Sequence, residues 1–224
     1  MSGDEPTGAH PEEPLSLSKR HLEGPSAVIF DCGNVLYGWD PGSFLVRQIA
    51  DDAARLRFIE DVDLWSWHDS LDGGRGFDEA ASELSEKFPD YADLISAWGS
   101  RFGETIGEPV PGVHAIVEQL DARGVPLFVI TNFSAEFWPP FRAKEDAFFR
   151  RFRHIVVSGE EKLLKPDPAL YFRALHRFGL QPREALFIDD REINVEGARA
   201  VGMRAILFTT AEELRGELKA QGLL

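Results

Sequence analysis

The chain has 224 residues, of which 43% are hydrophobic and 28% charged, so it can bury the core of one domain or of a domain with a sizeable insertion. Its formal net charge of −14 argues against a nucleic-acid backbone as the main partner, because that binding relies on Lys and Arg to neutralise phosphates. A single cysteine, Cys32, excludes an internal disulfide and favours a reducing compartment. No stretch approaches the roughly 20 apolar residues that cross a bilayer, so we expect a cytoplasmic protein with no membrane partner.

The first 25 residues differ in composition from the rest of the chain. They are rich in Pro, Glu, Ser and Gly, and they hold too little apolar surface to offset the entropy cost of ordering them. We therefore predict that residues 1–25 form a mobile tail.

An apolar run, Ala27 to Phe30, follows the tail and ends at Asp31. Such runs are typical of strands in a parallel sheet, and the polar and glycine residues that come next end the strand. Because ligands of open parallel sheets bind at the carboxyl ends of the strands, Asp31 is the candidate nucleophile. We interpret its neighbour Cys32 as a packing residue.

Residues 41–107 are predicted to form a helical insertion. Helical patterns cover Phe44 to Ile59, Phe77 to Phe88 and Tyr91 to Phe102, and no run has the pattern of a strand. The insertion follows the strand that bears Asp31, so we expect it to cover the carboxyl edge of the sheet and to exclude water there.

The insertion is also acidic, with 15 acids against five bases between Asp51 and Val110. Such a surface repels a small anion. An anionic substrate would therefore need a cationic anchor elsewhere in the site.

After the insertion, helical and strand patterns alternate. The predicted strands are Val125 to Ile130, His154 to Val157, Ala185 to Ile188 and Arg204 to Phe208, and the helices between them are centred on Val113 to Leu120, Pro168 to Phe178 and Ile193 to Val201. Strands that are apolar on both faces and separated by helices indicate an α/β fold, with a parallel sheet covered by helices on both faces.

Polar residues follow four of these strands: Asp31, Thr131-Asn132, Ser158 with Lys165 shortly after it, and Asp189-Asp190. Parallel strands bring their carboxyl ends to one edge of the sheet. Two acidic sites, a hydroxyl and a lysine gathered there suit a phosphate group and a divalent cation.

Each residue type has a role in that chemistry. Asp31 can attack phosphorus and form an aspartyl phosphate, while Asp190, with Asp189 beside it, completes a Mg²⁺ site with Asp31. Thr131 can donate its hydroxyl to a phosphoryl oxygen, and Lys165 supplies the cationic anchor. We expect the nearby Asn132 to support its loop or to hydrogen-bond Asp31.

The same segments resemble the four ordered motifs of the haloacid dehalogenase-like hydrolase superfamily. The matching residues are Val28 to Leu36, Val129 to Asn132, Lys165 to Tyr171, and Phe187 to Asp190 with Asn194 to Ala198 after it. Phe30 to Val35 and Phe137-Trp138-Pro139 resemble a branch that includes sugar-phosphate phosphatases such as α-D-glucose-1-phosphate phosphatase.

The resemblance implies a Rossmann-like core, formed here by residues 26–40 and 108–224, with a helical cap at 41–107. It also implies a Mg²⁺-dependent phosphatase that acts on a small phosphorylated substrate. We expect a monomer or homodimer. The resemblance assigns Asp31 as nucleophile and metal ligand, Thr131 and Lys165 as phosphate binders, and Asp190, supported by Asp189, as a metal ligand beside the Gly33 carbonyl. We therefore expect catalysis by Asp31, Thr131, Asn132 and Lys165, substrate binding by Gly33, Asn34, Thr131, Asn132 and Lys165, and a metal held by Asp31, Gly33, Asp189 and Asp190.

One position departs from the family pattern. Most phosphatases of the superfamily carry an acid/base Asp two residues after the nucleophile, where this chain has Gly33. Two other functions therefore stay open: a 2-haloacid dehalogenase that uses Asp31 without metal, and a non-catalytic homologue that binds a phospho-ligand or a protein. The Asp189-Asp190 pair favours the phosphatase over the dehalogenase, whose branch lacks it.

Aromatic residues in the insertion can be interpreted as substrate contacts or as packing residues. Trp65, Trp67 and His68 could contact substrate, and His68 could replace the missing acid/base, but their spacing favours packing between helices. Asp40, nine residues after Asp31, is expected to be a helix cap or hinge residue.

Overall fold

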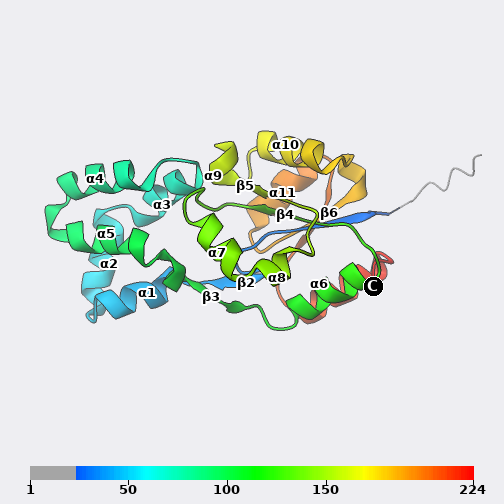
Figure 1. Ribbon diagram of the computed structural model, residues 1–224, viewed down its shortest axis with the longest axis horizontal. Coiled ribbons are helices and arrows are strands. Elements are labelled where there is room, and N and C mark those ends of the chain that lie inside the picture. The colour runs from blue at the N-terminus through cyan, green and yellow to red at the C-terminus, as the bar shows by residue number, and fades with distance from the viewer. Residues whose placement is uncertain (1–23) are drawn as a thin grey trace, which may run out of the picture.

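The computed structural model describes residues 24–224, so all of the predicted tail except Gly24 and Pro25 lies outside the described residues (Figure 1). Five parallel strands form one sheet in the order β5-β4-β1-β6-β7. They are β1 (Ala27–Phe30), β4 (Leu127–Thr131), β5 (His154–Val157), β6 (Ala185–Asp189) and β7 (Arg204–Leu207). The predicted α/β fold with a parallel sheet is therefore confirmed.

Helices cover both faces of the sheet (Figure 1). One face carries α6 (Val113–Ala122) and α12 (Ala211–Ala220), and the other carries α10 (Pro168–Phe178) and α11 (Glu192–Ala200). Successive strand residues point to opposite faces, so Val28 and Phe30 pack on the first pair of helices while Ala27 and Ile29 pack on the second. Each large apolar side chain buried in this way stabilises the fold by about 1.5–3 kcal/mol.

Short helices lie between the larger elements of the core. They are α7 (Trp138–Lys144), α8 (Asp146–Phe149), α9 (Ser158–Glu161) and the 3₁₀ turn η3 (Pro182–Glu184). In residues 24–224, no helix has the length and apolar character needed to cross a membrane.

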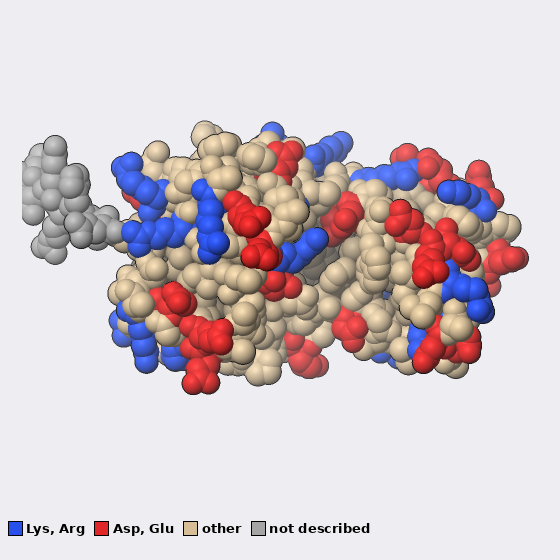
Figure 2. All heavy atoms as spheres, turned by 180° about the vertical axis from the view of Figure 1, so that it is seen from behind, with Lys and Arg blue, Asp and Glu red and all other residues tan. Residues whose placement is uncertain are grey.

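A helical part extends beyond the carboxyl edge of the sheet (Figure 1). It holds α1 (Pro41–Gln48), α2 (Asp52–Asp61), α3 (Leu64–Asp72), α4 (Phe77–Lys87), α5 (Ala92–Ser100), and the 3₁₀ turns η1 (Pro89–Tyr91) and η2 (Phe102–Thr105). Figure 2 shows many Asp and Glu side chains on this part of the molecule, on the right in that view.

Two details of the helical part differ from the sequence-based expectation. The single helix predicted over Phe44 to Ile59 is two helices, because Ile49 is extended and the Asp51 side chain caps α2 by accepting a hydrogen bond from the Ala54 amide at 2.7 Å. Helix α3 was not predicted at all.

A small antiparallel sheet joins the helical part to the core. Its strands are β2 (Tyr37–Trp39) and β3 (Ile106–Pro109), and Trp39 pairs with Ile106. The prediction that 41–107 contains no strand is therefore wrong at Ile106 and Gly107, where a four-residue strand is too short and too rich in Gly and Pro to be recognised. The chain leaves and re-enters the core through these two strands.

Candidate active site

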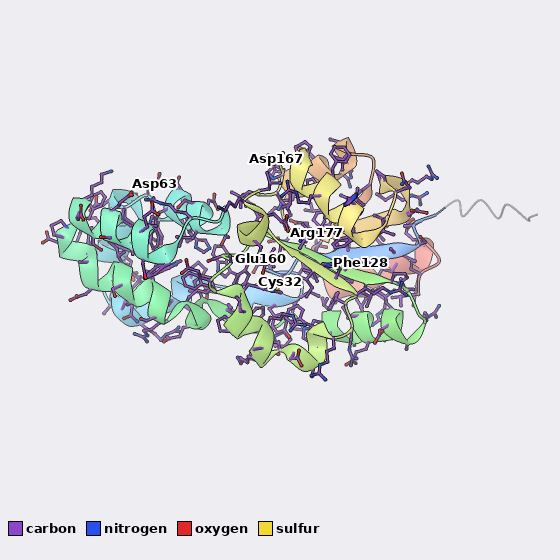
Figure 3. All side chains as sticks on the ribbon, turned by 45° about the horizontal axis from the view of Figure 1, so that its top comes forward. Cys32, Asp63, Phe128, Glu160, Asp167 and Arg177 are labelled. Carbon is purple, nitrogen blue, oxygen red and sulfur yellow. The ribbon has the colours of Figure 1, made fainter. Side chains whose placement is uncertain are left out.

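A cavity of about 280 Å³ lies between the carboxyl ends of the central strands and the helical part. Six of the predicted site residues line it: Asp31, Gly33, Asn34, Asn132, Lys165 and Asp190. Figure 3 shows Cys32, the neighbour of Asp31, where the sheet meets the helical part. The strand order reverses between β1 and β6, which is the place where open α/β sheets bind ligands.

Lys165 joins two carboxylates at the floor of the cavity. Its Nζ lies 2.8 Å from Asp31 Oδ1 and 2.6 Å from Asp189 Oδ2, and its side chain is almost fully buried. Burial opposes the charged ammonium, but the two carboxylates outweigh burial and raise the pKa of Lys165. The lysine is therefore a fixed positive charge beside Asp31.

Asp31 is buried and lies close to two other carboxylates, despite the neighbouring lysine. Burial raises its pKa to about 7, with Lys165 lowering it and the charges of Asp189 and Asp190 raising it further. Its Oδ1 also accepts a hydrogen bond from the Cys32 amide at 2.6 Å. The carboxylate is thus aimed and held by its own loop.

Three carboxylates gather at this point, each offering an oxygen within 4.8 Å of the others: Asp31, Asp189 and Asp190. Asp189 is already satisfied, because it accepts hydrogen bonds from Lys165, from the Asn194 side chain at 3.0 Å and from the Arg191 amide at 2.9 Å. Within residues 24–224, the side chain of Asp190 accepts one side-chain hydrogen bond, from Asn34 Nδ2 at 3.2 Å. The free oxygens of the cluster therefore belong mainly to Asp31 and Asp190.

This donor set fits a divalent cation. Three carboxylates face one ammonium group, so the cluster carries excess negative charge that Mg²⁺ would offset. Asn194 lines the same cavity, and its buried Oδ1 has no hydrogen-bond partner, so this oxygen can accept a hydrogen bond from a water of the ion's hydration shell. Mg²⁺ prefers such sites, which supply few carboxylates and leave room for water.

Asn132 connects two of the strand-end loops. Its Oδ1 accepts a hydrogen bond from the Lys165 amide at 2.9 Å, and its Nδ2 donates to the Lys165 carbonyl at 3.2 Å. Thr131, by contrast, is buried below the cavity lining, and its hydroxyl donates to the Asn132 carbonyl at 3.4 Å. The structure therefore places Asn132 as the positioning partner of Lys165.

The opposite wall of the cavity comes from the helical part and from β2 and β3. It is aromatic and apolar, and includes Trp39, Trp65, His68, Phe102 and Ile106. His68 stacks against Trp39 and Phe102, with ring centroids 5.2 and 5.7 Å apart. Trp65 and His68 were expected to serve helix packing; both also line the cavity, whereas the Trp67 indole donates to the Ala80 carbonyl.

The family model of the haloacid dehalogenase-like hydrolases matches residues 25–202, which is most of the chain. The chain belongs to this family. The matched region contains the five site residues Asp31, Asn132, Lys165, Asp189 and Asp190, and a hydrolase activity follows from the membership.

Two curated relatives differ in how much of their length this hydrolase covers. It is 28% identical to a sesquiterpene phosphatase of Aspergillus oryzae over 84% of the chain and 94% of that protein. It is 29% identical to acyl-CoA dehydrogenase family member 10 of Mus musculus over 87% of the chain, but spans only 19% of that protein. Among solved structures, a family enzyme of Bacteroides thetaiotaomicron in complex with magnesium and inorganic phosphate shares the fold, with a TM-score of 0.61 at 20% identity over 84% of this chain and 96% of that one.

Two carboxylates in the cavity of this hydrolase were not identified from the sequence. Asp69 and Asp72 both lie on α3 and both line the cavity. Asp69 is exposed, while Asp72 is buried. The four-residue spacing from His68 to Asp72 could have indicated that these two side chains lie on one helix face. Because α3 was not predicted, the sequence did not place them together.

Proposed function

We propose that this hydrolase is a Mg²⁺-dependent phosphatase that acts on a small phosphorylated metabolite through an aspartyl phosphate on Asp31. The observation that carries the proposal is the arrangement of Asp31 at the cavity floor, with Lys165 2.8 Å away and Asp190 in the same acidic cluster. A nucleophile, a phosphate-binding cation and a metal-binding pair are the groups that this reaction needs.

In the first step, an Asp31 oxygen attacks phosphorus and the bond from phosphorus to the substrate oxygen breaks. Lys165 Nζ lies beside the attacking carboxylate, so it offsets negative charge both on Asp31 and on the arriving phosphate. Asn132 keeps the Lys165 backbone in place through its two hydrogen bonds. Water then releases phosphate from Asp31 in the second step.

We propose that Asp31 and Asp190, together with the Gly33 carbonyl, hold the Mg²⁺, and that Asp189 supports them through Lys165. When bound, Mg²⁺ supplies positive charge to the phosphoryl oxygens and lowers the repulsion between substrate and carboxylates. The hydrogen bonds of the two carboxylates support this assignment. Asp189 already accepts hydrogen bonds from three different residues, whereas Asp190 accepts one, from Asn34, and keeps oxygen lone pairs available for a metal ion.

The cavity limits the substrate to a small molecule with at least one apolar face. Its volume of about 280 Å³ is at the lower end of ligand pockets, and Trp39, Trp65 and Phe102 form its outer wall. A sugar phosphate can place its ring against such a wall. The phosphatase relative that acts on a sesquiterpene extends the range to be tested to phosphorylated terpenoids.

Hydrolysis of a panel of phosphorylated metabolites tests the proposal, with Asp31→Asn as the blank. The panel contains sugar phosphates, isoprenoid phosphates and p-nitrophenyl phosphate, each with Mg²⁺ and with EDTA. We expect phosphate release that needs both Mg²⁺ and Asp31. A rate equal to that of Asp31→Asn under every condition would contradict the proposal and favour the non-catalytic alternative.

The same preparation distinguishes the phosphatase from the dehalogenase. Release of chloride from 2-chloropropionate in the presence of EDTA, without phosphate release from any ester, would support the dehalogenase. The Asp189-Asp190 pair argues against this outcome, because Asp190 has no role in a metal-free displacement at carbon.

A further inference from the structure

The proposed phosphatase reaction requires a proton donor that the nucleophile loop does not supply. When Asp31 attacks phosphorus, the leaving oxygen departs on the side opposite to Asp31. Asp31 belongs to the sheet edge, so the leaving group departs toward the helical part. Gly33, which lines the cavity, has no side chain to protonate it. The proton donor must therefore come from the wall that faces the sheet.

Asp72 has the properties required of this donor. It is the last residue of α3, it lines the cavity that contains Asp31, and it is only 6% exposed. Its Oδ1 has no hydrogen-bond partner, and its Oδ2 lies 3.6 Å from His68 Nε2. A buried carboxyl with an unpartnered oxygen is costly, so its position in a ligand cavity points to a function.

The surrounding contacts hold Asp72 in place. The Ser158 hydroxyl donates to the Asp72 carbonyl at 2.6 Å and accepts from the Phe133 amide at 2.9 Å. Two residues on, Gly74 has a φ of +93°, and a Cβ there would lie 2.7 Å from the Gly159 carbonyl oxygen. The end of α3 is thus tied to the core loops after β4 and β5, which also belong to the site.

Other groups near the cavity fit the role less well. Asp69 is exposed, and Asp40 is the N-cap of α1, where its side chain accepts from the Ser43 amide. His68 lies between two aromatic rings, and burial lowers its pKa to about 4. Its imidazole is therefore neutral near pH 7 and is not available as an imidazolium acid. These comparisons leave Asp72 as the candidate.

We propose that Asp72 is the acid/base of the reaction and replaces the carboxyl missing at position 33; this inference rests on the proposed phosphatase function. In the first step, the Asp72 carboxyl gives its proton to the substrate oxygen as that oxygen leaves phosphorus. In the second step, the Asp72 carboxylate takes a proton from the water that attacks phosphorus, and the bond to Asp31 breaks. Asp31 and Asp72 are then restored.

The surroundings of Asp72 favour the protonated form that the first step needs. Burial raises its pKa well above the usual value, and the charges of Asp69 and Asp31 act in the same direction. A backbone hydrogen bond from Ser134 and the charge of Lys165 oppose them. His68, the remaining titratable group that faces Asp72, is neutral near pH 7 and adds no positive charge.

Asp72→Asn tests the proposal on two substrates that differ in their need for a proton. Asn has nearly the same shape as Asp but cannot supply an acid. For an alkyl phosphate we expect kcat/KM to fall by about 10²- to 10⁴-fold. For p-nitrophenyl phosphate, whose leaving group needs no proton, we expect a burst of p-nitrophenol at a rate within about tenfold of wild type, followed by slow turnover because the second step lacks its base.

Asp63→Asn is the matched control. Asp63 is an exposed residue at the other end of α3, its side chain caps nothing, and Figure 3 shows it on the helical part, apart from Cys32. We expect its rates to equal those of wild type on both substrates. Circular dichroism of both variants checks that α3 is retained.

Two outcomes would overturn the inference while leaving the phosphatase function standing. One is an Asp72→Asn enzyme as active as wild type on the alkyl phosphate. The other is an equal loss on both substrates with no burst, which indicates a structural role for Asp72. If wild type hydrolyses no phosphate ester at all, the proposed function itself fails, and the two failures are therefore distinguishable.

Discussion

Lys165 carries much of the electrostatic organisation of this site, because its single ammonium group compensates both Asp31 and Asp189. Removing one member of a buried ion pair leaves the other charges unpaired, at a cost of roughly 3–5 kcal/mol. We expect Lys165→Met to lose phosphatase activity and to lower the free energy of unfolding by about that amount at pH 7. Urea denaturation measures the loss, and unchanged stability would show that the lysine does not compensate the pair.

Substitution of Asp72 is expected to change stability in the opposite direction to Lys165→Met. The pKa of Asp72 is higher in the folded than in the unfolded state, so this residue lowers the free energy of unfolding at pH values above its unfolded pKa. The loss of stability is smallest at low pH. Asp72→Asn removes this loss. We expect the variant to be more stable than wild type at pH 8, with a difference that shrinks as the pH falls toward 4.

Urea midpoints of wild type and Asp72→Asn across this pH range measure the effect. A variant that is less stable than wild type at pH 8 would mean that the carboxylate is well compensated. A gain in stability together with a loss of activity would mark Asp72 as a residue kept for chemistry.

At the scale of elements, α9 packs closely against the loop after β4, which carries part of the site. A Cβ on Gly159 would collide with the Ala135 amide nitrogen and lie 2.9 Å from the Phe133 carbonyl oxygen. Both neighbours are backbone and cannot rotate away. We expect Gly159→Ala to destabilise the protein by about 1–3 kcal/mol and to reduce activity, because the loop after β4 must shift.

Gly216→Ala is the control for this substitution. Gly216 lies inside α12, and a Cβ there meets nothing within 4 Å. We expect a gain of about 0.5–1 kcal/mol from helix propensity, with activity unchanged. If the two alanine variants behaved alike in thermal denaturation, the close approach at Gly159 would have no effect on the fold.

An element can be predicted from the sequence when the residues that determine it lie close together along the chain. Strands β1, β4 and β6 are apolar up to the last residue of β4 and β6 and buried on both faces, so a short window of sequence is enough to predict them. Helix α3, Leu64–Asp72, mixes aromatic, acidic and small residues because it faces the cavity, the core and solvent in turn. Its apolar residues Leu64, Trp67 and Leu71 recur at helical spacing, but the pattern covers only nine residues, which is shorter than the window over which helical periodicity is recognised.

The same reasoning applies to the site. Asp31, Asp189 and Asp190 were predictable because parallel topology brings strand ends together, whereas Lys165, which lies beyond α9, was predicted from the motif around it. The contribution of Asp72 depends on how the helical part packs on the core, through Ser158 and two glycines. That packing is a long-range property, which a motif does not contain.

At the scale of the whole molecule, binding of Mg²⁺ should stabilise the fold. The charge of −14 and the acidic cluster both favour a cation, and an ion at about 100 times its Kd adds about 2.7 kcal/mol to stability. We expect Mg²⁺ to raise the Tm of wild type and of Asp63→Asn, but to have little effect on Asp190→Asn. An equal shift in all three would indicate nonspecific screening of the acidic surface.

Phosphorylation of Asp31 during turnover can be measured directly. Wild-type protein is mixed with p-nitrophenyl phosphate and Mg²⁺, quenched in acid during turnover and examined by peptide mass spectrometry. We predict one phosphoryl group on the peptide that contains Asp31, at its highest level in Asp72→Asn, and none in Asp31→Asn. Steady phosphate release without a phosphoryl group on Asp31 would show that Asp31 is not the nucleophile.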